Sequence, residues 1–173
     1  MGKTDPGEKS VRRRSGFTMV EVLVTIAVIG IAASVAIPAF SVWMANYRLK
    51  DGTRSLISAI QLARLTAIKE NRSIEIWFWN ANETYKAFVD DDGDKTWDVG
   101  ERVIIEGTMP EGVDIVSCMI TNTGNQTMFN NRGMSSEWGY VYLKNGKGRW
   151  QRITLHYTGV TEIHDSTNGT TWN

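Results

Sequence analysis

The sequence of 173 residues has only one cysteine, Cys118, and no pattern typical of a catalytic centre. A single cysteine cannot form a disulfide within the chain, and in an apolar strand it usually behaves as a small buried hydrophobic residue. His156 and His164 lack the ligand spacing of a zinc site, and there is no nucleophile elbow or phosphate-binding loop. We therefore expect a protein that is not an enzyme and that needs no cofactor for catalysis.

The chain also lacks an excess of charge of either sign, since 19 Lys and Arg balance 19 Asp and Glu. The distribution is uneven, however, because no charged residue lies between Glu21 and Arg48. Residues 1–16 hold five basic and two acidic residues, which leaves 14 basic against 17 acidic in the rest of the chain and a net charge of −3. A mildly acidic chain does not predict a general affinity for nucleic acids.

What is present is a long uncharged apolar run from Val22 to Phe40, close to the ~20 residues that a helix needs to cross a bilayer core. A secretory signal peptide is the alternative, but its apolar region is shorter and ends in small residues at a cleavage site. Here the run has Pro38 near its end and continues into a helical polar pattern. We predict a retained membrane anchor whose basic N-terminal side stays in the cytoplasm, so that the rest of the chain lies across the membrane.

Glu21 is the one acidic residue at the start of this anchor. An ionised carboxylate in a membrane helix costs about 2.5–3.5 kcal/mol or more and usually has a partner. The nearest basic residues, Arg14 and Arg48, flank the apolar segment and do not lie within it. The partner of Glu21 is therefore expected to come from outside the apolar segment.

The residues from Gly16 to Leu23, GFTMVEVL, follow a basic leader and resemble the type IV prepilin signature. The resemblance implies that a prepilin peptidase cuts between Gly16 and Phe17 and that the new Phe17 amine is N-methylated. It also implies that Glu21 pairs with the Phe17 ammonium of a neighbouring subunit during assembly. Such a pair would supply the cation that Glu21 lacks within its own segment.

The rest of the chain predicts an α+β protein with one long helix followed by antiparallel strands. The helical pattern continues to about residue 71, with Leu56, Ile60, Ala63 and Ala67 on one face. A two-residue period then begins, with a hairpin at 73–89 and turn signals between later segments. We expect a leader at 1–16, a membrane or filament-core helix at 17–40, its amphipathic continuation at 41–71 and a β-rich domain at 72–173. The further strands are expected at 102–106, 113–120, 126–129, 139–143, 150–157 and 160–163.

The order of these parts resembles the GspH/FimT family of minor pilins and pseudopilins. Three looser motifs carry the resemblance beyond the leader: FVD leading to GE at 88–101, MFNNRG at 128–133, and RITL followed by YTG at 152–159. It implies two packed β-sheets on the helix and a structural subunit at or near the tip of a type IV pilus or a type II secretion pseudopilus. Such a subunit is anchored in the bacterial inner membrane, has its domain in the periplasm, and supports pilus biogenesis or protein secretion with other pilins.

The sharpest polar cluster runs from Asp90 to Glu101. Its side-chain oxygens fall at positions 1, 3, 5, 7, 9 and 12, the spacing with which an EF-hand loop wraps Ca²⁺. Position 6 is Lys95 where an EF-hand loop has glycine, and an acidic, solvated hairpin turn explains the same composition. If Ca²⁺ binds, the expected ligands come from Asp90, Asp92, Asp94, Asp98 and Glu101.

A second cluster combines basic residues with Trp150, as binders of single-stranded nucleic acid do. Its candidate contacts are Lys147, Arg149 and Arg152. Some FimT-like proteins bind DNA for uptake in natural transformation through a Gly-Arg-x-Arg motif, but the corresponding Gly159-Val160-Thr161-Glu162 has neither arginine. The alternatives are therefore a DNA-binding minor pilin and an ordinary solvated strand and turn.

Overall fold

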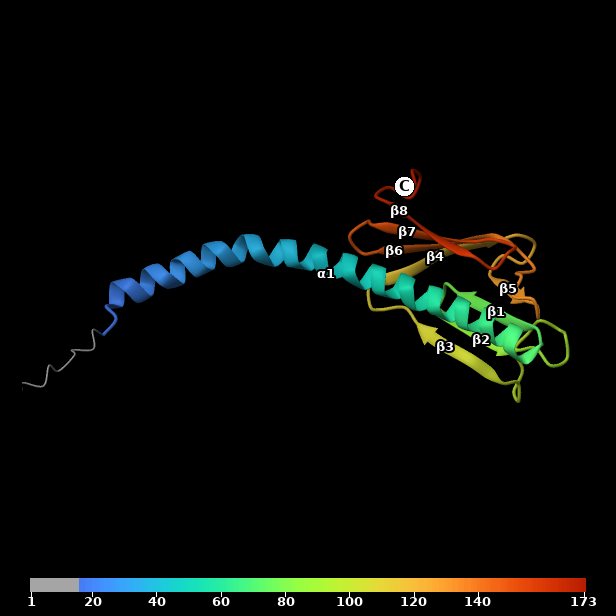
Figure 1. Ribbon diagram of the computed structural model, residues 1–173. Helices are drawn as coiled ribbons and strands as arrows, with labels where there is room; N and C mark the ends of the chain where they lie inside the picture. The colour runs from blue at the N-terminus through green and yellow to red at the C-terminus, as the bar shows by residue number, and fades with distance from the viewer. Residues whose placement is uncertain (1–15) are drawn as a thin grey trace, which may run out of the picture. The chain divides into compact units, whose positions relative to one another are not determined.

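The computed structural model describes residues 16–173, which form two compact units divided between Ala39 and Phe40. Apart from Gly16, the predicted leader lies outside the described residues. Helix α1 (Met19–Glu70) runs through both units, as Figure 1 shows. It starts two residues later than predicted because the Thr18 hydroxyl accepts the N–H of Glu21 at 3.2 Å and caps the helix.

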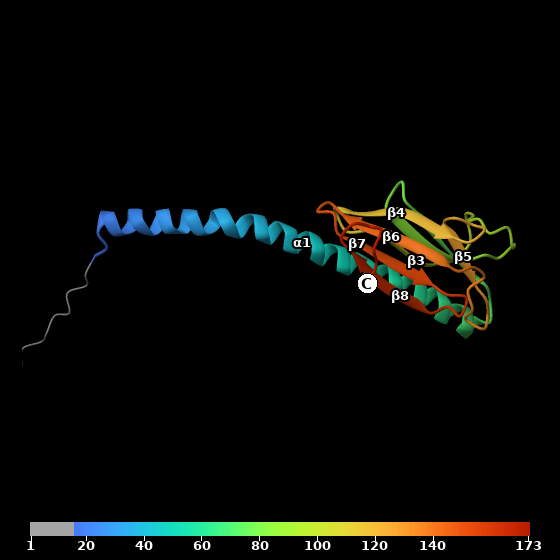
Figure 2. The same cartoon turned by 90° about the horizontal axis from the view of Figure 1, so that it is seen from above.

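Eight strands follow α1 and form two four-stranded antiparallel sheets. The first sheet has the order β3-β2-β1-β5 and the second β4-β6-β7-β8, so the predicted class of one helix with two packed sheets is confirmed. Figures 1 and 2 show both sheets beside the C-terminal part of α1. The strands are β1 (Ile74–Trp79), β2 (Thr84–Val89), β3 (Val103–Thr108), β4 (Val113–Ile120), β5 (Gln126–Phe129), β6 (Gly139–Asn145), β7 (Trp150–Leu155) and β8 (Thr161–Ser166).

The last two strands differ from the prediction at their facing ends. β7 ends at Leu155, where a strand to residue 157 was expected, and β8 begins one residue late and extends to Ser166. The reason is a tight turn in which the N–H of Gly159 donates to the carbonyl of His156 at 2.8 Å. Gly159 has φ +75°, a conformation that glycine adopts at little cost.

One hydrophobic core joins the second half of α1 to the inner faces of both sheets. The predicted helical stripe is confirmed, since Leu56, Ile60, Ala63 and Ala67 are all buried. On β1, Ile74, Ile76 and Phe78 are buried in the same core. The alternation of apolar residues therefore determines which side of each element faces inward.

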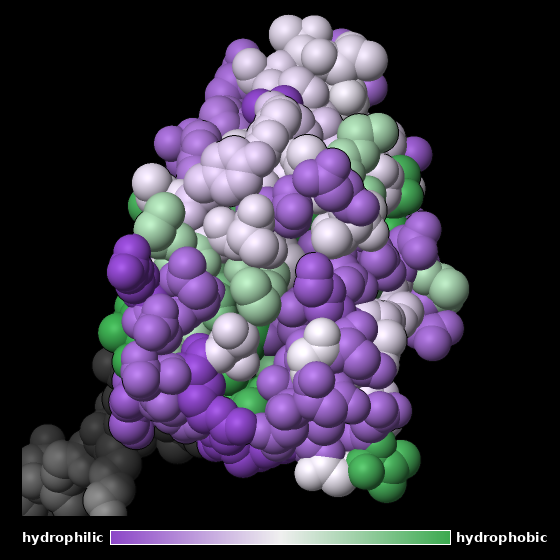
Figure 3. All heavy atoms as spheres, turned by 90° about the vertical axis from the view of Figure 1, so that its right-hand side faces the viewer, coloured by the Kyte–Doolittle hydropathy of each residue, from purple (hydrophilic) through white to green (hydrophobic). Residues whose placement is uncertain are grey.

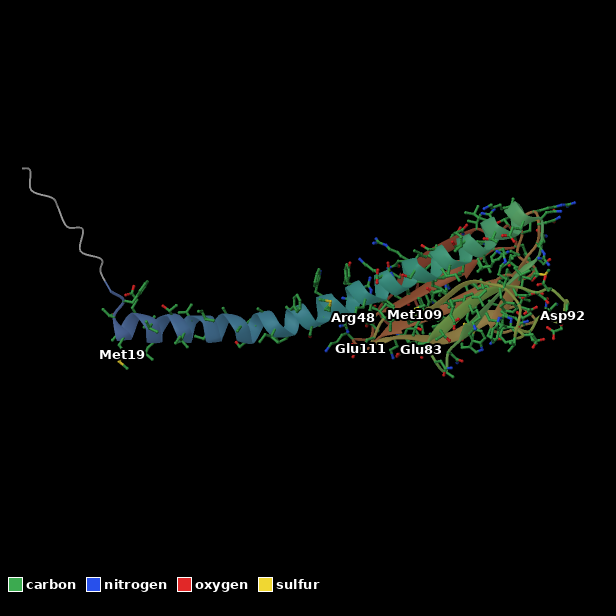
Figure 4. The ribbon with its side chains drawn as sticks, turned by 90° about the horizontal axis from the view of Figure 1, so that it is seen from below. Met19, Arg48, Glu83, Asp92, Met109 and Glu111 are labelled. Carbon is green, nitrogen blue, oxygen red and sulfur yellow. The ribbon has the colours of Figure 1, made fainter. Side chains whose placement is uncertain are left out.

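Specific contacts fix α1 to the rest of its unit. The hydroxyl of Thr53 donates to Oε1 of Gln151 on β7 at 2.5 Å, and both side chains are buried. Gly52 lies so close to the segment after β3 that an added Cβ would be 2.9 Å from Cδ of Pro110. Between the sheets, the carboxylate of Glu83, which is labelled in Figure 4, accepts the N–H of Ile115. These contacts join the helix and both sheets, so the position of each is fixed by the other two.

Candidate functional site

The first candidate region is the part of α1 before Phe40, which exposes its apolar side chains. Every residue from Gly16 to Phe40 is exposed apart from Ala33, which is half-buried. Within residues 16–173, α1 is the one helix long and apolar enough to cross a membrane, and none of its most apolar window is buried. A surface of this kind is stable in lipid or against other helices rather than in water.

Glu21 lies in the first turn of α1 and is exposed. The spacing of Thr18 and Glu21 is that of a capping box, and the positive end of the helix dipole favours a carboxylate there. Within the described residues, the Glu21 side chain has no ion-pair or hydrogen-bond partner, whereas its backbone N–H donates to the Thr18 hydroxyl and its carbonyl accepts the Thr25 hydroxyl. Phe17 is 81% exposed and lies at the start of the same apolar surface.

The second candidate region is the acidic loop, defined as Asp90 to Glu101, which connects β2 to β3. Figure 4 shows Asp92 at the opposite end of the domain from Arg48 and Glu111, and this end is mainly hydrophilic (Figure 3). Of the five predicted Ca²⁺ ligands, the structure brings together Asp90, Asp92 and Asp94, with one carboxylate oxygen from each within 4.8 Å of the others. This is the one group of three or more potential metal ligands among residues 16–173.

The other two predicted ligands lie differently. Oε1 of Glu101 accepts the N–H of Asp91 at 2.9 Å, and Oε2 accepts the N–H of Asp98 at 3.0 Å. Glu101 therefore ties the two ends of the acidic loop together. Partial desolvation and the negative charges of Asp94, Asp92 and Glu101 raise the pKa of Asp98, whereas hydrogen bonds from Thr96 lower the pKa of Asp94.

Glu75 on β1 is a charged residue whose burial the sequence analysis missed. It lies on the outer face of the first sheet, opposite Phe88 on β2, yet its side chain is only 1% exposed. Its Oε1 atom is buried and has no hydrogen-bond partner among the described residues. Burial first, and then the charge of Asp90, raise the pKa of Glu75 to about 7, while Lys95 opposes the shift. The alternation of residues along β1 indicated on which face of the sheet Glu75 lies. It did not indicate that the acidic loop covers this face.

The structure does not gather the three cations predicted for nucleic-acid binding into one patch. Arg149 lies 3.7 Å from Asp165, on the side of β7 where Gln151 also contacts Asp165. Arg152 lies on the other face, with its guanidinium 4.8 Å from the rings of Tyr140 and Trp172. Lys147 is in the turn between β6 and β7. The three side chains therefore do not share a surface on which one strand could bind.

The outer face of the second sheet carries a row of aromatic rings in contact, which the sequence analysis did not single out. Successive ring centroids are 5.5–5.9 Å apart, and Arg152 lies over two of the rings. The alternation from residue 138 to 142 was the signal that could have revealed this row. Its members are Trp138, Tyr140, Tyr142 and Trp172.

Two family models match the chain. The family described as "Type II transport protein GspH" matches residues 52–159, which include α1 from Gly52 onward and strands β1 to β7. The "Prokaryotic N-terminal methylation motif" matches residues 11–37, which include Gly16, Phe17 and Glu21. The two matches thus correspond to the apolar region and to the folded domain.

Among curated proteins, the pilin-like protein PilA1 of Thermus thermophilus is 30% identical over 90 residues. The match includes 51% of this chain and spans 56% of that protein's length.

Two solved structures have a similar fold at low sequence identity. The minor pseudopilin EpsH from the type 2 secretion system of Vibrio cholerae has a TM-score of 0.53 at 13% identity, covering 67% of this chain and 95% of that one. The type IV minor pilin FimU of Pseudomonas aeruginosa has a TM-score of 0.52 at 12% identity, covering 70% and 91%. The long helix followed by two sheets is therefore the fold of known pilins and pseudopilins.

Proposed function

The chain belongs to the family of the type II transport protein GspH, and we propose that it is a non-enzymatic minor subunit of a type IV pilus or a type II secretion pseudopilus. The observation that carries this proposal is the exposed apolar helix before Phe40, joined to a domain that already has a complete core. A subunit of a filament needs both parts, because one holds neighbours together and the other presents a folded surface.

Glu21 and Phe17 are the residues proposed to direct assembly. Cleavage after Gly16 would create an ammonium group on Phe17, and its methylation would keep the positive charge. In a filament, the carboxylate of Glu21 would pair with that ammonium group on a neighbouring subunit. Among apolar helices such a pair is far less costly than either charge left alone.

The same proposal implies a route for the chain. The basic leader would keep the N-terminus in the cytoplasm, where a prepilin peptidase removes residues 1–16, and the domain would lie in the periplasm. Residues 17–40 would remain in the inner membrane until the subunit enters a filament with other pilins. A place at or near the filament tip is proposed from the likeness to minor pilins and pseudopilins.

The test is to follow incorporation into filaments of a Glu21→Gln variant. Glutamine keeps the polar end that a capping box uses but removes the charge. We expect membrane insertion and processing to be retained and the filament-associated fraction to fall at least about tenfold, given the cost of an unpaired partner charge. Asp51→Asn, which removes an exposed carboxylate from the second half of the same helix, is the matched control. Normal incorporation of Glu21→Gln would overturn this role for Glu21.

A further inference from the structure

The acidic loop holds three carboxylates at the spacing of ligands to a shared ion. One oxygen each from Asp90, Asp92 and Asp94 lies within 4.8 Å of the other two. Oxygens bound to one Ca²⁺ at about 2.3–2.6 Å can be at most about 5 Å apart, so this spacing needs little rearrangement. The Asp90 oxygens are held in place by the N–H groups of Gly93 at 2.8 Å and Lys95 at 3.2 Å.

The loop covers a second, independent negative group, the buried carboxylate of Glu75. Glu75 and Phe88 face each other on the outer side of the first sheet, and Phe88 is fully buried although it is on that side. Trp97 of the acidic loop lies over Lys86 of β2, with the ammonium nitrogen 3.8 Å from the ring centroid. The loop therefore folds back over this face and encloses Glu75.

The Glu75 carboxylate is buried on the face of the sheet that the loop covers. The charged groups that act on it most strongly are Asp90 and Lys95, both in the loop, and Asp90 repels it. With Oε1 buried and unpartnered among residues 16–173, the Glu75 side chain adds negative charge beneath the loop when it is ionised. A cation in the loop would offset this repulsion, and the weakly screened surroundings would strengthen its attraction to Glu75.

The backbone at the sixth position also matches a calcium loop. Lys95 has φ +64°, the left-handed conformation that favours glycine, which is the residue EF-hand loops have at this position. The backbone therefore makes the sharp turn despite the lysine side chain. At this position, the difference from an EF-hand loop is the positive charge of the lysine and the strain of its left-handed backbone.

We propose that the acidic loop binds one Ca²⁺ ion through Asp90, Asp92 and Asp94, and that the buried carboxylate of Glu75 strengthens the negative field that holds the ion. Ca²⁺ fits better than Mg²⁺ because an exposed loop can supply an irregular set of oxygens, whereas Mg²⁺ requires near-octahedral geometry. This site is separate from the apolar helix and does not depend on assembly.

The full chain in detergent is titrated with Tb³⁺, a Ca²⁺ mimic whose luminescence is excited by a nearby tryptophan such as Trp97. We expect saturable luminescence that Ca²⁺ displaces at up to about 1 mM, the range of extracellular calcium modules, and that equal Mg²⁺ displaces poorly. Asp90→Asn combined with Asp92→Asn should weaken Ca²⁺ binding at least about thirtyfold, because two ligand charges are lost. Asp114→Asn, which changes an exposed carboxylate on β4, should leave binding unchanged.

Two further variants test how the buried negative charge of Glu75 and the positive charge of Lys95 affect the affinity for Ca²⁺. Glu75→Gln should weaken Ca²⁺ binding about three- to tenfold, since one nearby charge is removed without loss of a ligand. Lys95→Gly should tighten it by a similar factor, because it removes a positive charge and suits the left-handed backbone.

A wild-type chain with no luminescence and no change in melting temperature at about 5 mM Ca²⁺ would overturn the site, as would equal binding by the double Asn variant. Unchanged affinity in Glu75→Gln would overturn the role of the buried charge. If Glu75→Gln does not fold, Glu75→Leu, whose apolar side chain suits a buried position, replaces it in this test.

Discussion

The two parts of α1 contain similar apolar residues in opposite surroundings. Leu23, before Phe40, is 57% exposed, whereas Leu56, after it, is fully buried against the two sheets. The second region makes its core from its own chain, and the first has an apolar surface that its own chain does not cover. The domain can therefore be stable as one molecule, whereas the apolar surface before Phe40 is stable in lipid or against other subunits.

The two regions also differ in the surroundings of a carboxylate. Among the described residues, the Glu21 side chain and Oε1 of Glu75 both lack a hydrogen-bond partner. Glu75 is buried by its own chain, so groups within the chain determine how stable its charged form is. Glu21 is exposed on an apolar helix, so the lipid or the subunits around that helix determine how stable its charge is. The same residue type therefore has a different role in each region.

The largest effect on stability is expected from a matched pair of leucine substitutions. Leu56→Ala should lower the free energy of unfolding by about 3 kcal/mol, because it leaves a cavity in the core. Leu23→Ala should change it by less than about 0.5 kcal/mol, since that side chain has no packing within its own chain to lose. Urea unfolding in detergent, followed by tryptophan fluorescence, measures both. Equal losses of unfolding free energy in the two variants would contradict the difference in packing between Leu23 and Leu56.

A pH-dependent effect is expected from Glu75→Gln in the presence of a chelator. Because burial raises the pKa of Glu75 from 4.5 to about 7, the folded state holds the proton more tightly than the unfolded chain. This contribution to stability is complete below about pH 4.5 and is lost as the pH rises through about 7.

Glu75→Gln should therefore be more stable than the wild type at pH 8 by up to about 2–3 kcal/mol, with little advantage at pH 4.5. Unfolding curves at both pH values measure the difference. An advantage that is the same at both would show that the carboxyl group does not titrate in this range.

The smallest effect is expected from a pair of glycine substitutions. Alanine is normally favoured over glycine in a helix by about 1 kcal/mol. At Gly52, however, the new Cβ would lie 2.9 Å from Cδ of Pro110 and 3.3 Å from Sδ of Met109, so Gly52→Ala should cost about 1 kcal/mol. Gly30→Ala meets nothing within 4 Å in its own chain and should not destabilise the domain. Thermal unfolding of the two variants compares them.

Much of the fold could be predicted from residue periodicity. The stripe of Leu56 and Ile60 and the alternation of Ile74 and Ile76 indicated which faces are buried, and they are buried as expected. Strand neighbours could not be predicted in this way, because alternation indicates a face and not a partner. The pairing of β1 with β5 joins Ile74 to Phe129 across a long stretch of sequence and depends on how the whole chain packs.

The candidate sites were predictable to different degrees. The spacing from Asp90 to Asp94 predicted the carboxylates that converge, but the turn of Glu101 towards backbone N–H groups depends on the path of the loop. The predicted grouping of Arg149 with Arg152 did not take the strand period into account. Residues three apart along a strand point to opposite faces, and the structure places these two on different sides of β7.

In an assembled filament, residues 17–40 are proposed to be covered by helices of other pilin-type subunits. A photo-crosslinking amino acid at Ile29, which is 60% exposed, tests this contact in cells that assemble filaments. We expect adducts between this chain and another pilin-type subunit, which disappear when Glu21→Gln is added. The same amino acid at Val160, in the turn before β8, controls for exposure. Adducts with lipid alone, or protein adducts unchanged by Glu21→Gln, would overturn this proposal.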